Sequence, residues 1–216
     1  MNPYEAVIFD MDGVIVDSEP IHEWAFRDVL NEIGYGETHG LDFKAYYGMA
    51  DRRVWQDFFA KHRPSQSLEQ LAEWKQRRFL EILDRDRPIF EPLPPLLERL
   101  SRRCKLAIAS GSSHPIIRGV LALENLRRFF PVVVSAEDVP RGKPAPDIFL
   151  RAAELLDVKP ERCWVIEDSV AGVEGALASG MRVIGITNSL PSARLSRATH
   201  VVATYEEIER LLLPSS

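Results

Sequence analysis

Short apolar runs alternate along much of the chain with segments whose apolar residues repeat at helical spacing. Several of these runs are continuously apolar, which is typical of strands covered on both faces. Strands that alternate with helices predict an α/β fold, with a doubly wound parallel sheet joined by crossover helices. The expected strands are AVIF (6–9), KLAIA (105–109), VVVS (132–135), CWVIE (163–167), RVIGI (182–186) and HVVA (200–203). The expected helices lie near 115–124, 146–156, 170–179 and 205–213.

The connection between the first two expected strands is too long for a single crossover helix. Its pattern is helical throughout, and Gly34 stands where a first helix would end. The apolar positions of that first helix follow i, i+3, i+4, i+7 spacing: Phe26, Val29, Leu30 and Ile33. A later stretch has helical spacing at Leu71, Trp74, Arg78, Phe79 and Ile82. Both stretches therefore predict amphipathic helices.

Helix-breaking segments flank this helical connection. DSEP at 17–20 leads into it, and RPIFEPLPP at 87–95 leads out of it. Breakers at both ends are typical of a subdomain inserted between two elements of another domain. We therefore predict an inserted α-helical cap of residues 16–87, hinged at both ends, on a core formed by residues 1–15 and 88–216.

The composition is that of an ordinary soluble globular protein. Of the 216 residues, 45% are hydrophobic and 27% are charged. No apolar run approaches the roughly 20 residues that a membrane span needs. The first residues, MNPYEAVIFD, have no basic segment and too short an apolar stretch for a secretory signal. We therefore expect a cytoplasmic protein without membrane partners.

Charge and cysteine content narrow the partners further. The formal net charge is −5 and no Lys/Arg run is present, which argues against a nucleic-acid partner. Cys104 and Cys163 each precede an apolar run, and we expect both to be reduced packing residues; a disulfide between them stays open. The expected ligand is a small molecule, and nothing in the sequence indicates an assembly larger than a monomer.

The first expected strand ends in two carboxylates. In VIFDMDG, Asp10 and Asp12 follow the buried run and only Met11 separates them. Residues at i and i+2 of a strand point to the same face, so the two side chains converge if the extended conformation persists. Gly13 then permits a sharp turn. A buried carboxylate is costly unless it is paired, protonated or bound to a metal, so a partner for this pair is expected.

Polar side chains also follow other expected strands. Ser110-Gly111-Ser112-Ser113 comes after KLAIA, and Glu167-Asp168-Ser169 completes and follows CWVI. Lys143 lies in RGKPAPD, between the third and fourth strands. In open α/β sheets, ligands bind beyond the carboxyl ends of the strands. We therefore expect these residues to meet at one edge of the sheet.

This set of groups indicates phosphoryl transfer. Carboxylates alone would repel one another, and Mg²⁺, which prefers carboxylate ligands and a substrate phosphate, removes that penalty. The Ser110–Ser112 turn offers hydroxyls and backbone N–H groups to an anion, helped by the dipole of the helix that follows. Lys143 adds a positive charge for the same anion. Acids for a metal and donors for a phosphate are the components that phosphoryl transfer requires.

Each component has an ordinary structural interpretation as well. Two aspartates one residue apart occur in many turns and metal-binding loops. Ser112, Ser113, Asp168 and Ser169 are all suited to helix N-caps. A single lysine is usually a solvated surface residue. The order of these components at successive strand ends is what favours the catalytic interpretation.

With these motifs the sequence resembles the haloacid dehalogenase superfamily of hydrolases. It is most similar to the subgroup that contains β-phosphoglucomutase and small sugar-phosphate phosphatases. The resemblance rests on four motifs in order: FDMDGVIVDSEP, ASGSS at 109–113, GKPAPDIF, and IEDSVAG at 166–172. It covers essentially the whole chain, and the helical insertion after the first motif matches the cap of the family. It implies a Rossmann-like core and a Mg²⁺-dependent enzyme.

The resemblance also implies roles for individual residues. Asp10 would be the nucleophile that forms an aspartyl phosphate, and Asp12 the general acid and base. Asp10, the main-chain carbonyl of Asp12, and Asp168 would hold Mg²⁺, with Glu167 acting through a coordinated water. The phosphoryl group would be held by Ser110, Gly111, Ser112 and Lys143. In the cap, His22 matches a histidine of the mutase, and Arg52 is a candidate for substrate contact.

Several activities are compatible with this resemblance. Asp12 argues against a dehalogenase, which lacks the second aspartate. The leading prediction is a phosphatase for a small phosphorylated metabolite, a sugar phosphate. A mutase must bind a second phosphate in the cap, and the cap segment YYGMADRR departs from the mutase pattern because Tyr47, not a lysine, precedes Gly48. The alternative is a hexose-phosphate mutase similar to β-phosphoglucomutase. A non-catalytic sugar-phosphate sensor is the third, and it has no need of Asp10.

Overall fold

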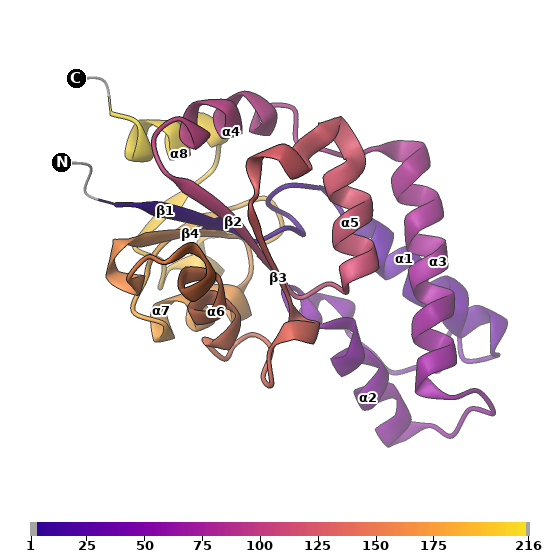
Figure 1. The fold of residues 1–216 in the computed structure, drawn as a ribbon. Coiled ribbons are helices and arrows are strands. Elements are labelled where there is room, and N and C mark those ends of the chain that lie inside the picture. The colour runs from indigo at the N-terminus through magenta and orange to yellow at the C-terminus, as the bar shows by residue number, and fades with distance from the viewer. Residues whose placement is uncertain (1–3, 215–216) are drawn as a thin grey trace.

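The structure, a computed structural model, describes residues 4–214 and contains a six-stranded, fully parallel sheet of order β3-β2-β1-β4-β5-β6 (Figure 1). The strands are β1 (Ala6–Phe9), β2 (Lys105–Ser110), β3 (Val132–Ser135), β4 (Cys163–Glu167), β5 (Arg182–Ile186) and β6 (His200–Val202). All six expected strands are confirmed to within one residue at their ends. The α/β class is confirmed as well.

Helices cover both faces of the sheet, as the continuously apolar strands predicted. They are α4 (Leu93–Ser101), α5 (His114–Ala122), α6 (Asp147–Leu156), α7 (Val170–Ala178) and α8 (Tyr205–Leu212). Helices α4 and α8 lie on one side of the sheet and α6 and α7 on the other (Figure 1). No helix within residues 4–214 combines the length and the apolar character needed to cross a bilayer.

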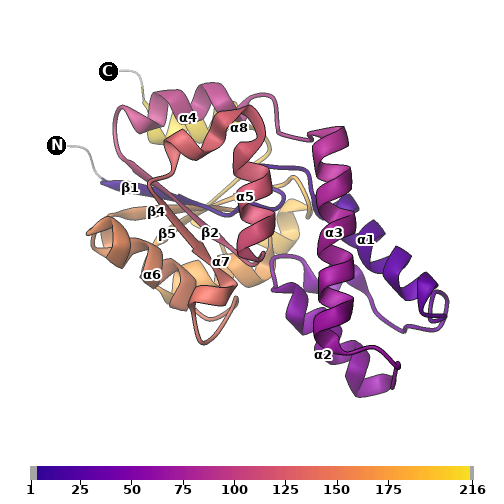
Figure 2. The same cartoon turned by 45° about the vertical axis from the view of Figure 1, so that its right-hand side comes forward.

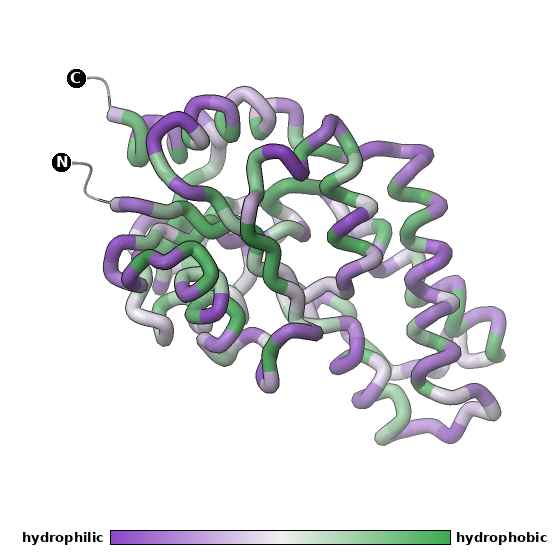
Figure 3. Tube along the Cα trace, in the orientation of Figure 1, coloured by the Kyte–Doolittle hydropathy of each residue, from purple (hydrophilic) through white to green (hydrophobic). Residues whose placement is uncertain are grey.

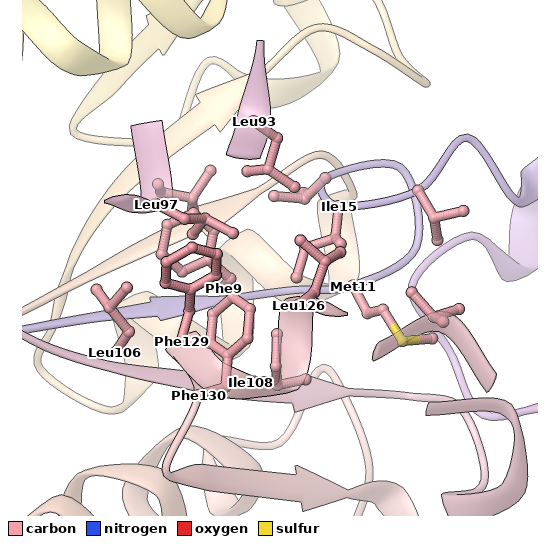
Figure 4. Close-up of a cluster of buried hydrophobic side chains, with 14 of the residues drawn as sticks. Phe9, Met11, Ile15, Leu93, Leu97, Leu106, Ile108, Leu126, Phe129 and Phe130 are labelled. Carbon is pink, nitrogen blue, oxygen red and sulfur yellow. The ribbon is translucent and has the colours of Figure 1, made fainter. Parts of the chain in front are cut away.

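Alternate residues of β1 serve the two faces. Phe9 packs with α4 and α5 residues in one apolar cluster, which Figure 4 shows around Phe9, Leu97 and Phe130. Ile8 points the opposite way, into a second cluster with residues of α6 and α7. The hydropathy colouring shows apolar positions concentrated along the strands (Figure 3). Burial of apolar surface on both faces is what fixes β1 in the middle of the sheet.

Three helices between β1 and α4 form a separate layer beside the sheet (Figure 2). They are α1 (Glu19–Glu32), α2 (Asp51–Lys61) and α3 (Leu68–Asp86). Phe26, Trp55, Phe58 and Leu71 are buried in an apolar cluster of their own. We call residues 16–87 the cap, and we propose that they form a unit distinct from the core.

The buried face of α3 differs from the predicted one. Its buried residues are Leu71, Lys75, Phe79 and Leu83, which repeat every fourth position. Trp74, Arg78 and Ile82 of the predicted stripe are only half-buried. The helix is rotated relative to the expectation because it packs against α1 and α2 on one side and α5 on another. This rotation turns a lysine toward the interior of the cap.

The segment that leads out of the cap also differs in part from the prediction. The sequence predicted a proline-rich linker at 87–95, whereas α4 already begins at Leu93. Pro94 and Pro95 occupy the first turn of that helix, where the missing N–H of proline has no helical acceptor to lose. The linker therefore ends at Pro92. Prolines at this position start a helix rather than end one.

Both cysteines are unpaired and serve packing, as expected. Cys163 is buried at the start of β4 and Cys104 is half-buried just before β2. Burial raises the pKa of the Cys104 thiol to about 12 and that of the Cys163 thiol to about 11. Thiols with such pKa values are unreactive at neutral pH.

Candidate active site

The carboxyl end of β1 carries the first two candidate residues into a tight loop. Phe9 pairs with Ile108 of β2 and Ile166 of β4, so the next residue, Asp10, emerges between the ends of both neighbouring strands. Its N–H donates to the Ile166 carbonyl at 2.9 Å. Gly13 turns the chain with a φ of +71°, and a Cβ there would lie 1.8 Å from a carboxylate oxygen of Asp168. Only glycine fits this turn.

Lys143 is a fully buried cation between two carboxylates. Its Nζ lies 2.7 Å from Asp10 Oδ1 and 2.7 Å from Glu167 Oε1. Burial acts to lower the pKa of Lys143, but the charges of Asp10 and Glu167 outweigh it, and the pKa is raised. The side chain is therefore a permanent ammonium at the end of the sheet. It is not the solvated surface lysine of the ordinary interpretation.

Glu167 is the most firmly held of the acidic residues. Its Oε2 accepts hydrogen bonds from the N–H groups of Asp168 and Ser169, at 2.9 and 2.8 Å, and from the Ser169 hydroxyl at 2.8 Å. Its Oε1 accepts from Lys143. A Cβ at Gly172 would lie 1.6 Å from Oε1, so the first turn of α7 is shaped around this carboxylate.

Three buried carboxylates converge at one point. Asp10, Glu167 and Asp168 each present an oxygen within 4.8 Å of the others. Burial raises the pKa of Asp10 well above its usual value, although Lys143 opposes the rise. Burial and the neighbouring Glu167 charge likewise raise the pKa of Asp168. The folded chain therefore holds acids together against their mutual repulsion.

The three carboxylates at this point are suitable ligands for a divalent cation. Asp168 Oδ1 is buried and has no hydrogen-bond donor within residues 4–214, while its Oδ2 accepts from the Ser189 hydroxyl. A buried oxygen without a donor is rare unless an ion or water occupies the position next to it. Oxygen-only ligands are those that Mg²⁺ and similar hard cations prefer.

Asp12 lies in a different environment from Asp10. Its Oδ1 accepts from the Ser18 hydroxyl at 2.6 Å and lies 3.0 Å from His22 Nε2. Its Oδ2 accepts from the Ser112 hydroxyl at 2.8 Å and from that of Ser110 at 3.4 Å. Burial acts to raise the pKa of Asp12, but the charge and hydrogen bonds it receives outweigh burial and lower it.

A buried network of hydrogen bonds and ion pairs in the cap holds His22. Nδ1 of His22 contacts Lys75 Nζ, and Lys75 in turn lies 2.6 Å from Asp51 Oδ2. The Lys75 side chain is fully buried, and its ammonium also lies 4.8 Å from the ring centre of Phe26. The network connects all three cap helices with Asp12. The orientation of His22 is therefore fixed by the packing of the cap.

The turn after β2 supplies the anion-binding groups. Ser110 is fully buried, and the Ser112 N–H donates to its hydroxyl at 3.0 Å. Gly111 and Ser112 line a small cavity together with Asp10 and Asp12. A Cβ at Gly111 would lie 3.1 Å from the Met49 carbonyl, so the cap loop rests directly on this turn. The cavity, about 40 Å³, lies between cap and core.

The structure brings together all the predicted core residues and one of the two predicted cap residues. His22 contacts Asp12, whereas Arg52 is exposed and lines a neighbouring groove, which shares Asp51 and Gly111 with the catalytic cavity. Sequence reasoning missed Ser18, Glu19, Lys75 and Ser189. For Lys75 a signal existed, since Leu71, Lys75 and Phe79 share one helix face.

Comparison with known proteins places the chain in a family. The model of the haloacid dehalogenase-like hydrolase family matches residues 4–180. The chain belongs to this family. The haloacid dehalogenase-like resemblance predicted from the motifs is thus confirmed, and so is the assignment as a hydrolase.

Relatives within the family carry named activities. The chain is 34% identical over 185 residues to the fructose-1-phosphate phosphatase YqaB of Escherichia coli, covering 85% of this chain and 96% of the relative. It is 34% identical over 212 residues to a phosphorylated carbohydrates phosphatase of Thermotoga maritima, covering 96% of each. Among solved structures, a β-phosphoglucomutase of Clostridium difficile matches with a TM-score of 0.82 at 26% identity, over 96% of each chain. The family therefore includes both phosphatases and mutases of this architecture.

Proposed function

We propose that the chain is a Mg²⁺-dependent phosphatase that hydrolyses a small phosphorylated metabolite, a sugar phosphate, through an aspartyl phosphate on Asp10. One observation supports this most strongly: Lys143 and the carboxylates of Glu167 and Asp168 converge on Asp10, while the Asp12 carboxylate is held separately by His22. The named activities of relatives in Escherichia coli and Thermotoga maritima point the same way.

The proposed reaction has two halves. An Asp10 oxygen attacks phosphorus, the bond to the sugar oxygen breaks, and Asp12 gives that oxygen a proton. Water then attacks the phosphoryl group on Asp10, and Asp12 takes the proton from this water. The negative charge of a bound phosphoryl group acts to raise the pKa of Asp12, which favours the protonated form that the first half needs.

Other residues bind the transferred group. Lys143, the Gly111 N–H and the hydroxyls of Ser110 and Ser112 are the proposed donors to its oxygens. Mg²⁺ would be held by Asp10, Asp168 and the main-chain carbonyl of Asp12, with Glu167 acting through a water, and it would neutralise the phosphoryl charge. The cap closes over the site and excludes bulk water.

A mutase of the β-phosphoglucomutase kind is the second candidate. The structural match to the Clostridium difficile enzyme favours it. Two features of this chain weigh against it. Tyr47 departs from the mutase pattern in the cap, and among the described residues no Lys or Arg of the cap lines the catalytic cavity. A mutase needs a cation for the second phosphate of its bisphosphate.

Phosphate release from a panel of sugar monophosphates in the presence of Mg²⁺ tests the proposal. We expect release of inorganic phosphate from at least one of them, and we expect Asp10→Asn to abolish it while leaving the melting temperature unchanged or higher. The Asp10→Asn variant removes the nucleophile but keeps its shape. Turnover of this variant near the wild-type rate would refute the assignment of Asp10.

A second experiment distinguishes a phosphatase from a mutase. β-Glucose 1-phosphate is incubated with the enzyme and a bisphosphate primer. Glucose 6-phosphate without free phosphate would identify a mutase, whereas free phosphate and glucose identify a phosphatase. Absence of both products, together with no release from an aryl phosphate, would favour the non-catalytic sensor.

A further inference from the structure

The loop after β5 contacts the catalytic site through two polar residues that the proposed reaction does not use. Asn188 and Ser189 follow Ile186, the last residue of β5, with only Thr187 between. Ser189 is half-buried, and its hydroxyl donates to Asp168 Oδ2. Among the described residues this hydroxyl is the one donor to the Asp168 carboxylate, because Oδ1 has none. The carboxylate is therefore held at one oxygen, and its other oxygen is left to bind a cation.

Asn188 acts on the turn that follows β1. Its Nδ2 donates to the Gly13 carbonyl at 2.8 Å and to the Tyr205 hydroxyl oxygen at 3.1 Å. Tyr205, buried at the start of α8, donates in turn to the Val14 carbonyl at 2.6 Å. Gly13 directly follows Asp12 in the chain. These bonds therefore fix the turn in which the main-chain carbonyl of Asp12 lies.

The turn and the loop also pack directly against each other. A Cβ at Gly13 would lie 2.6 Å from the Ser189 hydroxyl oxygen and 1.8 Å from Asp168 Oδ2. The hydroxyl, the carboxylate and the backbone of the turn thus leave no room for one further carbon atom. Such packing restricts the orientations that the Asp168 carboxylate can adopt.

We propose that Asn188 and Ser189 are positioning residues for the metal. Ser189 orients the Asp168 carboxylate, and Asn188 fixes the turn that carries the Asp12 carbonyl. This inference rests on the proposed Mg²⁺-dependent function, since both of these groups are proposed metal ligands. A ligand that is already oriented loses less conformational freedom when the metal binds. Residues that hydrogen-bond to metal ligands typically contribute about 10–100-fold to metal affinity.

Titration with Mg²⁺, followed by the melting temperature, measures this affinity without substrate or turnover. We expect Ser189→Ala and Asn188→Ala each to raise the apparent Kd for Mg²⁺ by about tenfold or more. Each variant is compared with its own metal-free melting temperature, so that a general loss of stability does not count. Ser192→Ala is the matched control, because it makes the same chemical change at an exposed serine between β5 and β6. Its Kd is expected to equal that of the wild type.

The dependence of activity on Mg²⁺ separates positioning of the metal from a merely structural role. With Mg²⁺ at the wild-type Kd, we expect kcat/KM of Ser189→Ala for p-nitrophenyl phosphate to fall by about fivefold, which follows from a tenfold rise in Kd. At saturating Mg²⁺ the value should return close to that of the wild type. A loss that persists at saturating Mg²⁺ while Kd is unchanged would overturn the inference.

The outcomes distinguish this inference from the function on which it rests. If Mg²⁺ neither stabilises the wild type nor supports hydrolysis of p-nitrophenyl phosphate, the proposed function itself fails. If the wild type binds Mg²⁺ and hydrolyses this substrate, a variant that keeps the wild-type Kd refutes the role of the residue it replaces. An equal rise in Kd in Ser192→Ala would assign the effect to the whole loop, and the inference would be wrong.

Discussion

At the scale of single residues, the site depends on two aspartates with opposite environments. Burial raises the pKa of Asp10, whereas the hydrogen bonds and charge around Asp12 lower its pKa. Environments that separate the pKa values of neighbouring acids are how a site assigns them different roles. Asp10, beside Lys143 and the metal cluster, is suited to attack phosphorus. Asp12, held by serines and His22, is suited to move a proton.

The proton-transfer role predicts a dependence on the leaving group. Asp12→Ala is expected to lower kcat/KM for a sugar phosphate by about 100-fold or more, since general acid catalysis contributes on the order of 10²–10⁴. The loss for p-nitrophenyl phosphate is expected to stay below about tenfold, because a phenolate leaves with little protonation. Steady-state kcat/KM is the proper measure, since it reports only the steps up to formation of the aspartyl phosphate.

The second half of the reaction gives an internal check on the same variant. Without a base for the attacking water, Asp12→Ala should release a burst of p-nitrophenol and then turn over slowly. His22→Gln is a milder companion, which removes one partner of Asp12 and keeps the carboxylate. Equal losses of kcat/KM on both substrates in Asp12→Ala would contradict the general-acid role.

At the scale of elements, glycines determine how closely cap and core approach. Gly48 has a φ of +77°, and a Cβ there would lie 2.1 Å from the Ser169 hydroxyl oxygen at the start of α7. On the core side, Gly111 leaves room for the Met49 carbonyl. The cap loop therefore approaches the core with its own backbone, at Gly48 and at the Met49 carbonyl. That contact places Tyr47 and Asp51 over the cavity.

Gly48→Ala tests this contact. The added methyl meets Ser169 and holds the cap away from the core, so we expect kcat/KM to fall by about tenfold or more, the scale of loss that misplacement of a catalytic group produces. Gly34→Ala is the matched control: its φ is +83°, but nothing lies within 4 Å of the added Cβ. Both variants should lose about 1 kcal/mol of unfolding free energy from backbone strain. A fall in kcat/KM of equal size in Gly34→Ala would refute a specific role for Gly48.

The elements also show why some features were predictable. Strands and core site residues follow local rules, since each buried run ends at a polar group and parallel strands end at one edge. The cap does not follow such rules, because the rotation of each helix depends on which neighbours it packs against. Lys75, which the predicted stripe of α3 omits, is therefore buried, and Arg52 lines a neighbouring groove instead of the catalytic cavity. Glu19 was overlooked because DSEP was interpreted only as a break before the helix.

At the scale of the whole molecule, the sheet order gathers charge that only a ligand can balance. β1 lies beside β4, so the ends of these strands place Asp10 and Asp168 in one buried space, and Lys143 reaches it from the segment between β3 and α6. The single ammonium does not neutralise three carboxylates. Raised pKa values of Asp10 and Asp168 mean that the metal-free fold is favoured when these acids are protonated.

The sign of this linkage predicts how metal and pH act together on stability. Acids with raised folded-state pKa values contribute stability below their usual value of 3.8, and this stability is lost as pH rises toward the folded-state pKa. Metal binding requires the deprotonated acids, so the rise in melting temperature on adding Mg²⁺ should grow from about pH 5 to about pH 8. At saturation of about 100 times Kd, binding adds about 2.7 kcal/mol, or a rise of about 5–10 °C.

Asp168→Asn separates metal binding from general salt effects in this experiment. The variant loses one charge of the cluster and a ligand, so its metal-free melting temperature at neutral pH should be equal to or above that of the wild type, while the rise with Mg²⁺ should disappear. Asp157→Asn provides a control on the surface, at the C-terminal end of α6. If Mg²⁺ stabilised Asp168→Asn as much as the wild type, or equally at both ends of the pH range, the buried cluster would not be the metal site.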